Sequence, residues 1–260
     1  MQGKRFFVLA AAALSACGGS TPITDTGYSD SCSPGGIWRA AGGSVAIIDE
    51  SPRVHLVQSD GTQFVGDVTG YTINNRECYF DREKSELHAV LPLGASLPDG
   101  SHSGTGRADA SWVKRSGQLQ LTADIKTSAS GKFTLAFIGA YDPLHGSGSS
   151  RAAIAGSYRP TSSPAAEVLT IDAAGQMFSQ NATTGCVING SIDPVDSRFD
   201  VYRVNLTYSA CQGALSPLNG LPVKGLATYD AGKTPAELFM ALDAASSLQH
   251  YSIVLTERRT

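Results

Sequence analysis

The sequence predicts an all-β protein with two tandem small antiparallel β-barrel or sandwich domains after an export signal. Apolar and polar residues alternate through both halves of the chain, which is the period of a half-buried strand. Gly, Ser and Thr are abundant and helical heptads are absent, which indicates short strands joined by turns. The 260 residues are enough for one or two domains that each bury a core.

The first sixteen residues have the layout of a secretory signal. Lys4 and Arg5 precede an apolar run from Phe6 to Leu14, and small residues follow it. As a helix this run would be roughly 14 Å long, which is too short to span a bilayer stably. We therefore predict residues 1–16 to be a signal peptide.

The end of this signal contains a candidate lipidation site. Leu14-Ser15-Ala16-Cys17 resembles the lipobox of bacterial lipoproteins, in which signal peptidase II cuts before the cysteine. The resemblance implies that the Cys17 thiol carries acyl chains such as palmitate, and several chains on one residue anchor a protein durably. Gly18 in place of Asp resembles an outer-membrane sorting signal, and polar residues 17–31 would be a lipidated tether. The alternative is an ordinary signal peptide in which Cys17 is incidental.

Charge limits the partners that we expect. The formal net charge is −3, and loss of Lys4 and Arg5 with the signal makes the remaining chain more acidic. Such a chain has no electrostatic reason to bind nucleic acid or anionic lipid. After the signal, no apolar run approaches the roughly eighteen residues of a transmembrane helix. The expected partners are the membrane, through lipid on Cys17, and a protein or another envelope component.

Four further cysteines are candidates for disulfides: Cys32, Cys78, Cys186 and Cys211. Four cysteines allow three connectivities, and an exported chain meets an oxidising compartment. The economical pairing is Cys32–Cys78 and Cys186–Cys211, each worth about 3–4 kcal/mol of stability. Buried free thiols are the alternative. Metal binding is disfavoured because no pair has CxxC spacing and no His lies near enough to complete a site.

A Gly- and Ser-rich segment divides the chain. His145 to Ser150 reads His-Gly-Ser-Gly-Ser-Ser, a composition typical of flexible linkers that few packing contacts cross. We predict a first β domain at residues 32–144, a linker at 145–155 and a second β domain at 156–260.

The two halves look related, which predicts a tandem repeat. Gly36-Ile37-Trp38-Arg39 matches Gly156-Ser157-Tyr158-Arg159 at the start of each half. Further on, Val54, Val57, Gly61 and Phe64 match Val168, Ile171, Gly175 and Phe178 at one fixed offset. Each block reads as strand, turn and strand, so convergent hairpins are the alternative to duplication.

Several segments alternate clearly. Leu119–Ile125 and Phe133–Phe137 do so in the first half, and Tyr202–Tyr208 and Tyr251–Leu255 in the second. Pro235–Ala245 contains good helix formers, although its centre could equally be a buried strand. With roughly eight strand-like segments per half, closure into small barrels is favoured.

One short motif suggests a barrel family. Gly36-Ile37-Trp38 resembles the Gly-x-Trp opening of lipocalin-like barrels, which implies a calyx able to hold a small ligand. Trp38, Trp112, Phe133 and Phe137 are the aromatic residues that could line such a cavity. Core packing is the alternative role for these side chains.

The sequence predicts no catalytic, metal or cofactor site. Gly100-Ser101-His102-Ser103-Gly104 has His where a serine hydrolase has its nucleophile, so it predicts a turn. The five histidines are scattered. Asp193, Asp196 and Asp200 lack the glycine and glutamate of a calcium loop and predict a solvated loop.

These observations favour a non-enzymatic lipoprotein of the bacterial envelope, most simply at the outer membrane, that binds another macromolecule or supports the envelope. A carrier of a small apolar ligand is the alternative. A hydrolase assembled from distant carboxylates is a remote third reading, because their separation is set by the fold.

Overall fold

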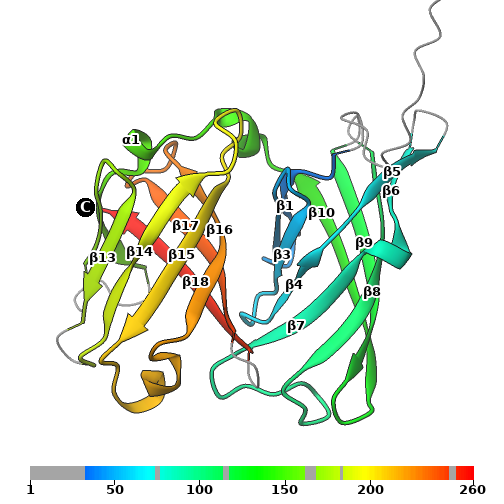
Figure 1. The fold of residues 1–260 in the computed structure, drawn as a ribbon. Coiled ribbons are helices and arrows are strands. Elements are labelled where there is room, and N and C mark those ends of the chain that lie inside the picture. The colour runs from blue at the N-terminus through cyan, green and yellow to red at the C-terminus, as the bar shows by residue number, and fades with distance from the viewer. Residues whose placement is uncertain (1–32, 74–76, 114–116, 162–167, 182–183, 246–249) are drawn as a thin grey trace, which may run out of the picture.

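The computed structural model describes residues 33–73, 77–113, 117–161, 168–181, 184–245 and 250–260. These residues form an almost entirely β structure in which two rings of antiparallel strands stand side by side (Figure 1). Both rings are closed by strand pairing. Of the two architectures predicted from the sequence, barrel and sandwich, the described residues therefore form the barrel. Among the described residues, no helix is long and apolar enough to cross a membrane.

The second half of the chain forms a simple closed meander. Each strand pairs with the next, and the last pairs with the first through Tyr158↔Arg259 and Pro160↔Glu257. Full closure leaves no long sheet edge to pair with other chains. The strands are β11 (Gly156–Pro160), β12 (Leu169–Ile171), β13 (Gln176–Gln180), β14 (Val187–Pro194), β15 (Tyr202–Ser209), β16 (Pro222–Asp230), β17 (Glu237–Ala245) and β18 (His250–Arg259).

The first half closes in the same way, with one addition. β4 pairs with β7, and the hairpin β5–β6 lies outside the ring and pairs with β8. The ring ends where β10 pairs with β1 through Trp38↔Tyr141. The strands are β1 (Gly36–Arg39), β2 (Val45–Ile48), β3 (Arg53–Val57), β4 (Gln63–Asp67), β5 (Gly70–Ile73), β6 (Glu77–Phe80), β7 (Glu86–Pro92), β8 (Gly104–Val113), β9 (Gln118–Thr127) and β10 (Lys132–Tyr141).

The alternating segments form strands as predicted. Along β9 and β15, every second residue is buried and the others are exposed. Of the two structures left open for Pro235–Ala245, the strand is the one that forms and the helix does not, because residues Glu237–Ala245 form β17 between β16 and β18. Helix propensity is a weak preference, and two full ladders of strand pairing outweigh it.

The two barrels share a buried contact. β7 and β18 pair in parallel through Tyr251↔Leu91 and Ser252↔Pro92. A third hydrophobic cluster lies between the rings and combines Ile37, Ile47, Val201, Leu226 and Ala241 with neighbouring apolar residues. The outer faces of β1 and β2 therefore pack against the second barrel.

The predicted flexible linker instead carries packed structure. Pro143–Ser147 forms the 3-10 helix η3, and Arg151–Ile154 forms the short helix α1. His145 is buried and stacks on Phe199, with ring centroids 4.6 Å apart. A Gly- and Ser-rich composition predicts flexibility, but it does not show where the segment lies in the fold. This segment crosses the junction between the two barrels, and packing contacts there hold it in place.

The repeat is only partly reflected in the structure. Trp38 Nε1 donates to the Pro34 carbonyl, and Tyr158 Oη donates to the Ile154 carbonyl, so the first strands of the two rings correspond. The second block does not correspond. It matches β3–β4, the third and fourth strands of the first ring, with β12–β13, which are the second and third strands of the second ring. Phe64 is 1 % exposed whereas its matched Phe178 is 49 % exposed. The block match reflects a shared hairpin pattern.

Candidate functional site

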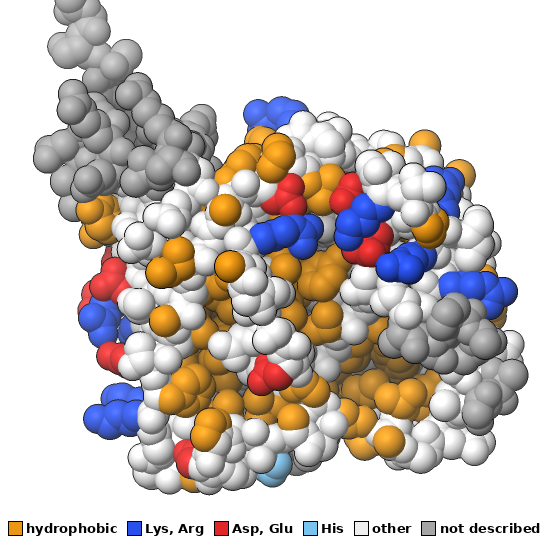
Figure 2. Space-filling view, turned by 180° about the vertical axis from the view of Figure 1, so that it is seen from behind, with side chains coloured by type: hydrophobic (Ala, Val, Ile, Leu, Met, Phe, Trp, Pro, Cys, Tyr) orange, Lys and Arg blue, Asp and Glu red, His pale blue; other side chains and the backbone are white. Residues whose placement is uncertain are grey.

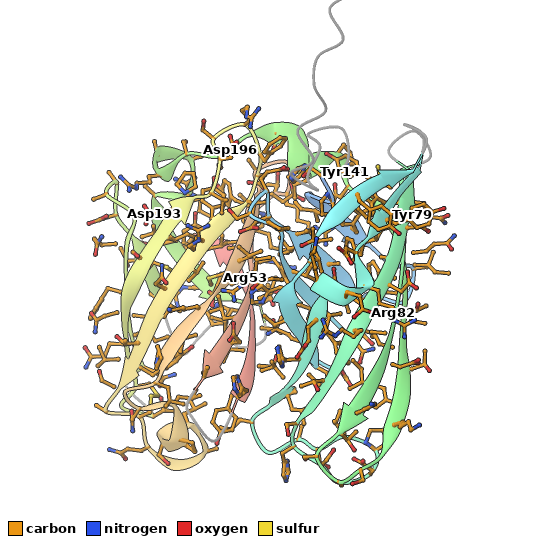
Figure 3. The ribbon with its side chains drawn as sticks, turned by 45° about the vertical axis from the view of Figure 1, so that its right-hand side comes forward. Arg53, Tyr79, Arg82, Tyr141, Asp193 and Asp196 are labelled. Atoms are coloured by element: carbon orange, nitrogen blue, oxygen red, sulfur yellow. A yellow bond between two sulfur atoms is a disulfide. The ribbon has the colours of Figure 1, made fainter. Side chains whose placement is uncertain are left out.

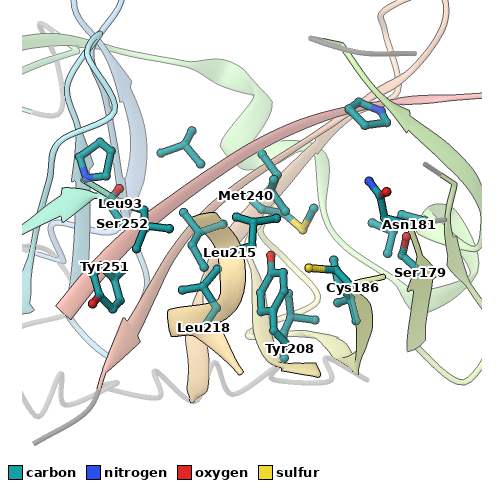
Figure 4. Close-up of a pocket in the computed structure, with 18 of the residues that line it drawn as sticks. Leu93, Ser179, Asn181, Cys186, Tyr208, Leu215, Leu218, Met240, Tyr251 and Ser252 are labelled. Carbon is teal, nitrogen blue, oxygen red and sulfur yellow. The ribbon is translucent and has the colours of Figure 1, made fainter. Parts of the chain in front are cut away.

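A cavity of about 570 Å³ is lined mainly by the second barrel and partly by Gly61, Pro92 and Leu93 of the first (Figure 4). Its walls come from β12–β15 and from β17 and β18, and its floor comes from the 3-10 helix η4 (Gly213–Leu218). The lining is mostly apolar, with Tyr208, Leu215, Leu218 and Met240 among the side chains that face it. A space of this size and character is typical of small-molecule sites.

The cavity arises from the residues on the inward face. Along β13, Met177 and Ser179 point inward while Phe178 points to solvent. A small Ser on the inner face and a large Phe on the outer face leave room inside the ring. Cys186, which lines the cavity, is bonded to Cys211 as predicted and ties the β13–β14 connection to the end of β15.

β18 forms one side of the cavity. Among the described residues, β12 has three residues, and the ladder between β11 and β18 runs from Tyr158 to Pro160. Tyr251, Ile253 and Leu255 on β18 are partly exposed and line the cavity. From behind, hydrophobic side chains gather in a hollow in the middle of the face, below a group of charged side chains (Figure 2).

The first barrel supplies one rim of this opening. Gly61, Pro92 and Leu93 line the cavity together with Ser252 of β18. Ser252 Oγ donates to the Gly61 carbonyl at 2.6 Å, and the fully buried Gln63 amide donates to Leu242 O and Ser252 Oγ, each at 2.8 Å. These bonds fix the position of the rim relative to the second barrel.

The other end of the second barrel is packed. Tyr158, Tyr202 and Tyr229 are buried there, and burial raises the pKa of Tyr202 to about 12. Asp200, 1 % exposed, accepts a hydrogen bond from the Tyr229 backbone N–H at 2.8 Å. Burial raises the pKa of its carboxyl to about 7, because the charged form is disfavoured away from water.

The aromatic residues proposed to line a cavity lie in the other barrel. Trp112 and Phe137 are buried in its core, and Phe133 packs against that core. Trp38 is part of the same core and also borders a separate cavity of about 460 Å³ beside Glu50 and His145. Core packing, the alternative role for these side chains, is therefore the one found: they fill the first barrel.

The acidic residues of the second half do not form a shared site. Asp193 pairs with Arg151 at 2.5 Å and Asp196 pairs with Arg198 at 2.6 Å, both at the upper end in Figure 3. Asp200 is buried beside Tyr229, as described above. No group of three or more candidate metal ligands occurs in the described part of the chain.

The histidines and the glycine-rich turn are also separate. His55 and His88 both align with Val65 but lie two strands apart, so they form no pair. His55 is fully buried and burial lowers its pKa, which keeps the ring neutral. Residues Gly100–Ser103 lie in the connection between β7 and β8, as the predicted turn, and Gly104 begins β8; within this turn Ser101 donates to Asp99.

Two predicted sites cannot be placed in full. Cys17 and Cys32 lie outside the described residues, so lipidation and the Cys32–Cys78 pairing stay predictions. Cys78 is buried on β6 and is disulfide-bonded.

Comparison with known proteins assigns no family. No protein-family model matches the chain, and the searches of curated proteins and of solved structures give no match.

Proposed function

We propose that this chain is an exported lipoprotein, anchored through Cys17 at the bacterial outer membrane, whose second barrel binds a small apolar ligand without converting it. The cavity of about 570 Å³ carries this proposal. Between the two binding roles left open by the sequence, it favours a small ligand over a macromolecule. Burial of apolar surface, at roughly 25 cal/mol per Å², would supply the affinity.

A binding role without catalysis fits the distribution of reactive groups. The described side chains that line the cavity include no His, and the carboxylates Asp193, Asp196 and Asp200 lie elsewhere. Each strand ring closes on itself, which supports treating residues 32–144 and 156–260 as two tandem domains. In this proposal the first domain and the tether position the second relative to the membrane.

Titration with an uncharged fluorescent probe, N-phenyl-1-naphthylamine, tests the proposal. The non-lipidated chain beginning at Gly18 is expected to bind one probe, with fluorescence that rises as the probe leaves water. Native mass spectrometry of the same protein from the periplasm would show a retained ligand as mass lost on denaturation.

A matched pair of double variants locates the probe. Leu206→Trp with Leu255→Trp places indoles on two walls of the cavity and should weaken binding by about tenfold or more. Ile138→Trp with Phe178→Trp adds the same bulk at two exposed positions and should leave binding unchanged. Equal binding by both double variants, or no binding by the parent protein, would refute the proposal.

A further inference from the structure

Sulfur-containing residues are concentrated at the cavity. The second half of the chain contains four of them: Met177, Cys186, Cys211 and Met240. Three of the four line the cavity, and Cys211 forms the disulfide with Cys186. In Figure 4 the sulfur atoms of Met240 and Cys186 point into the same space from different walls. The lining is therefore apolar but not purely aliphatic.

The two methionines come from facing walls. Around the described ring of eight strands, β13 is the third and β17 the seventh, so these two strands lie opposite each other. Met177 is 2 % exposed and Met240 is fully buried, and both belong to the core of the second barrel. A ligand inside this barrel would thus have a thioether on each side.

The first barrel is packed without methionine. Between Gly18 and Gln176 the sequence contains no Met, and Trp, Phe, Leu, Ile and Val fill that barrel. Both methionines that follow the predicted signal peptide therefore lie in the barrel with the cavity. A long, unbranched side chain adapts to irregular space, which is useful beside a ligand and unnecessary in a permanently filled core.

A thioether also favours a particular kind of ligand. Hydrophobic burial is proportional to apolar area, so it does not by itself favour an aromatic ring over a saturated ring of the same skeleton. The polarizable sulfur of Met makes a further favourable contact with an aromatic ring, at a distance of about 5 Å and often at the ring edge. Two thioethers on facing walls can both contact one flat ring system, and a saturated ring gains nothing from them.

We infer that the ligand of this cavity carries an aromatic ring system, which binds between Met177 and Met240. This inference rests on the proposed function, because it names the chemical class of the same ligand. It assigns the two methionines as specificity-determining residues. Saturated apolar ligands still enter the cavity, but with lower affinity.

Two bicyclic alcohols with one carbon skeleton test the inference: 1-naphthol, which is aromatic, and 1-decalol, its saturated counterpart. Both are uncharged at pH 7, and the saturated skeleton exposes at least as much apolar surface, so burial alone does not favour 1-naphthol. Isothermal titration calorimetry of the non-lipidated chain beginning at Gly18 gives both dissociation constants. We expect 1-naphthol to bind about tenfold more tightly than 1-decalol.

Exchange of Met for Leu removes the sulfur and conserves the volume of the side chain. Met177→Leu with Met240→Leu should weaken binding of 1-naphthol by about tenfold and change that of 1-decalol by less than about twofold, so that the preference disappears. A loss of packing alone would weaken both alcohols together. Leu119→Met with Leu121→Met is the control: it makes the reverse exchange in the packed core of the first barrel and should leave both dissociation constants unchanged.

The two dissociation constants of the parent protein decide the inference if the variant without methionines does not fold. Equal or tighter binding of 1-decalol by the parent overturns it. A folded variant that keeps the preference, or that loses affinity for both alcohols equally, overturns it as well. If N-phenyl-1-naphthylamine binds but neither alcohol does, this inference fails and the proposed function stands. If the probe does not bind either, the proposed function fails too.

Discussion

The two barrels have the same ring of eight strands but opposite interiors. In the first barrel, Trp112, Leu119 and Leu121 are almost completely buried and fill the ring. In the second, tyrosines fill one end, while Ser179 and aliphatic residues around the other end leave a cavity of about 570 Å³. Closure of the ring thus does not determine whether a barrel binds a ligand. Whether a cavity is left for a ligand depends on the size of the inward-facing side chains at each level along the barrel axis.

The largest expected difference comes from the same substitution in both barrels. Leu121→Ala removes a side chain from the packed core and should lower the free energy of unfolding by about 3–4 kcal/mol. Leu206→Ala borders the cavity, where fewer partner atoms are lost, and should cost about 1–2 kcal/mol. Urea unfolding of both variants checks this, and equal losses would mean that both interiors are equally packed.

The disulfide beside the cavity is the next largest contribution. Cys186→Ala with Cys211→Ala should lower the free energy of unfolding by about 3 kcal/mol, since the bridge closes a loop with a separation of 25 residues. The measurement is denaturant unfolding without reductant. A loss below about 1 kcal/mol would show that packing, not the bridge, holds the connection from β13 to β14.

The packed end of the second barrel should make the free energy of unfolding depend on pH. Burial raises the pKa of Asp200 to about 7, so the folded chain holds a proton that the unfolded chain releases. This contribution to stability is present at low pH and is lost as the pH rises through about 7. Between pH 5 and pH 8 it amounts to on the order of 2 kcal/mol.

Asp200→Asn removes this dependence while its amide oxygen still accepts the Tyr229 N–H. The difference between the parent and this variant, followed by thermal unfolding across pH, isolates Asp200 from His55. His55 acts in the opposite sense: its lowered pKa reduces stability as the pH falls below 6.5. A parent and variant with identical pH profiles would show that water reaches Asp200.

The smallest predicted effect concerns the contact between the barrels. Gln63→Leu leaves Leu242 O and Ser252 Oγ without their donor and should cost about 1–2 kcal/mol. It should also weaken binding of the naphthylamine probe by a few-fold, because the rim at Gly61 loses its support. Gln118→Leu, at an exposed position of β9, is the control and should change neither quantity. Unchanged probe binding in Gln63→Leu would mean that the rim plays no part in the site.

The strands and one disulfide could be predicted because local patterns determine them. Every second residue of Leu119–Ile125 and Tyr202–Tyr208 is apolar, and both segments form half-buried strands. The pairing Cys186–Cys211 could be predicted because the two cysteines lie in the same half of the chain. Residues Glu237–Ala245 were harder, since their helix propensity is overridden by neighbours that are distant in sequence.

The location of the cavity could not be predicted for a physical reason. Trp38, Trp112 and Phe137 are the side chains that a search for a ligand site selects, yet large aromatic residues fill space and leave no room for a ligand. The informative signal was Phe178 facing out with Ser179 facing in, and it requires knowing which face of β13 is inward. The rim formed by Gly61 and Pro92 depends on docking of the two barrels, which no local pattern encodes.

A crystal structure with a brominated long-chain alcohol tests the central claim most directly, because anomalous scattering locates the bromine atom. We predict a bromine peak inside the second barrel, between the side chains of Ile188 and Met240, and none inside the first barrel beside Trp112. A peak within the first barrel, or bromine only in surface grooves with the second barrel empty, would contradict the account.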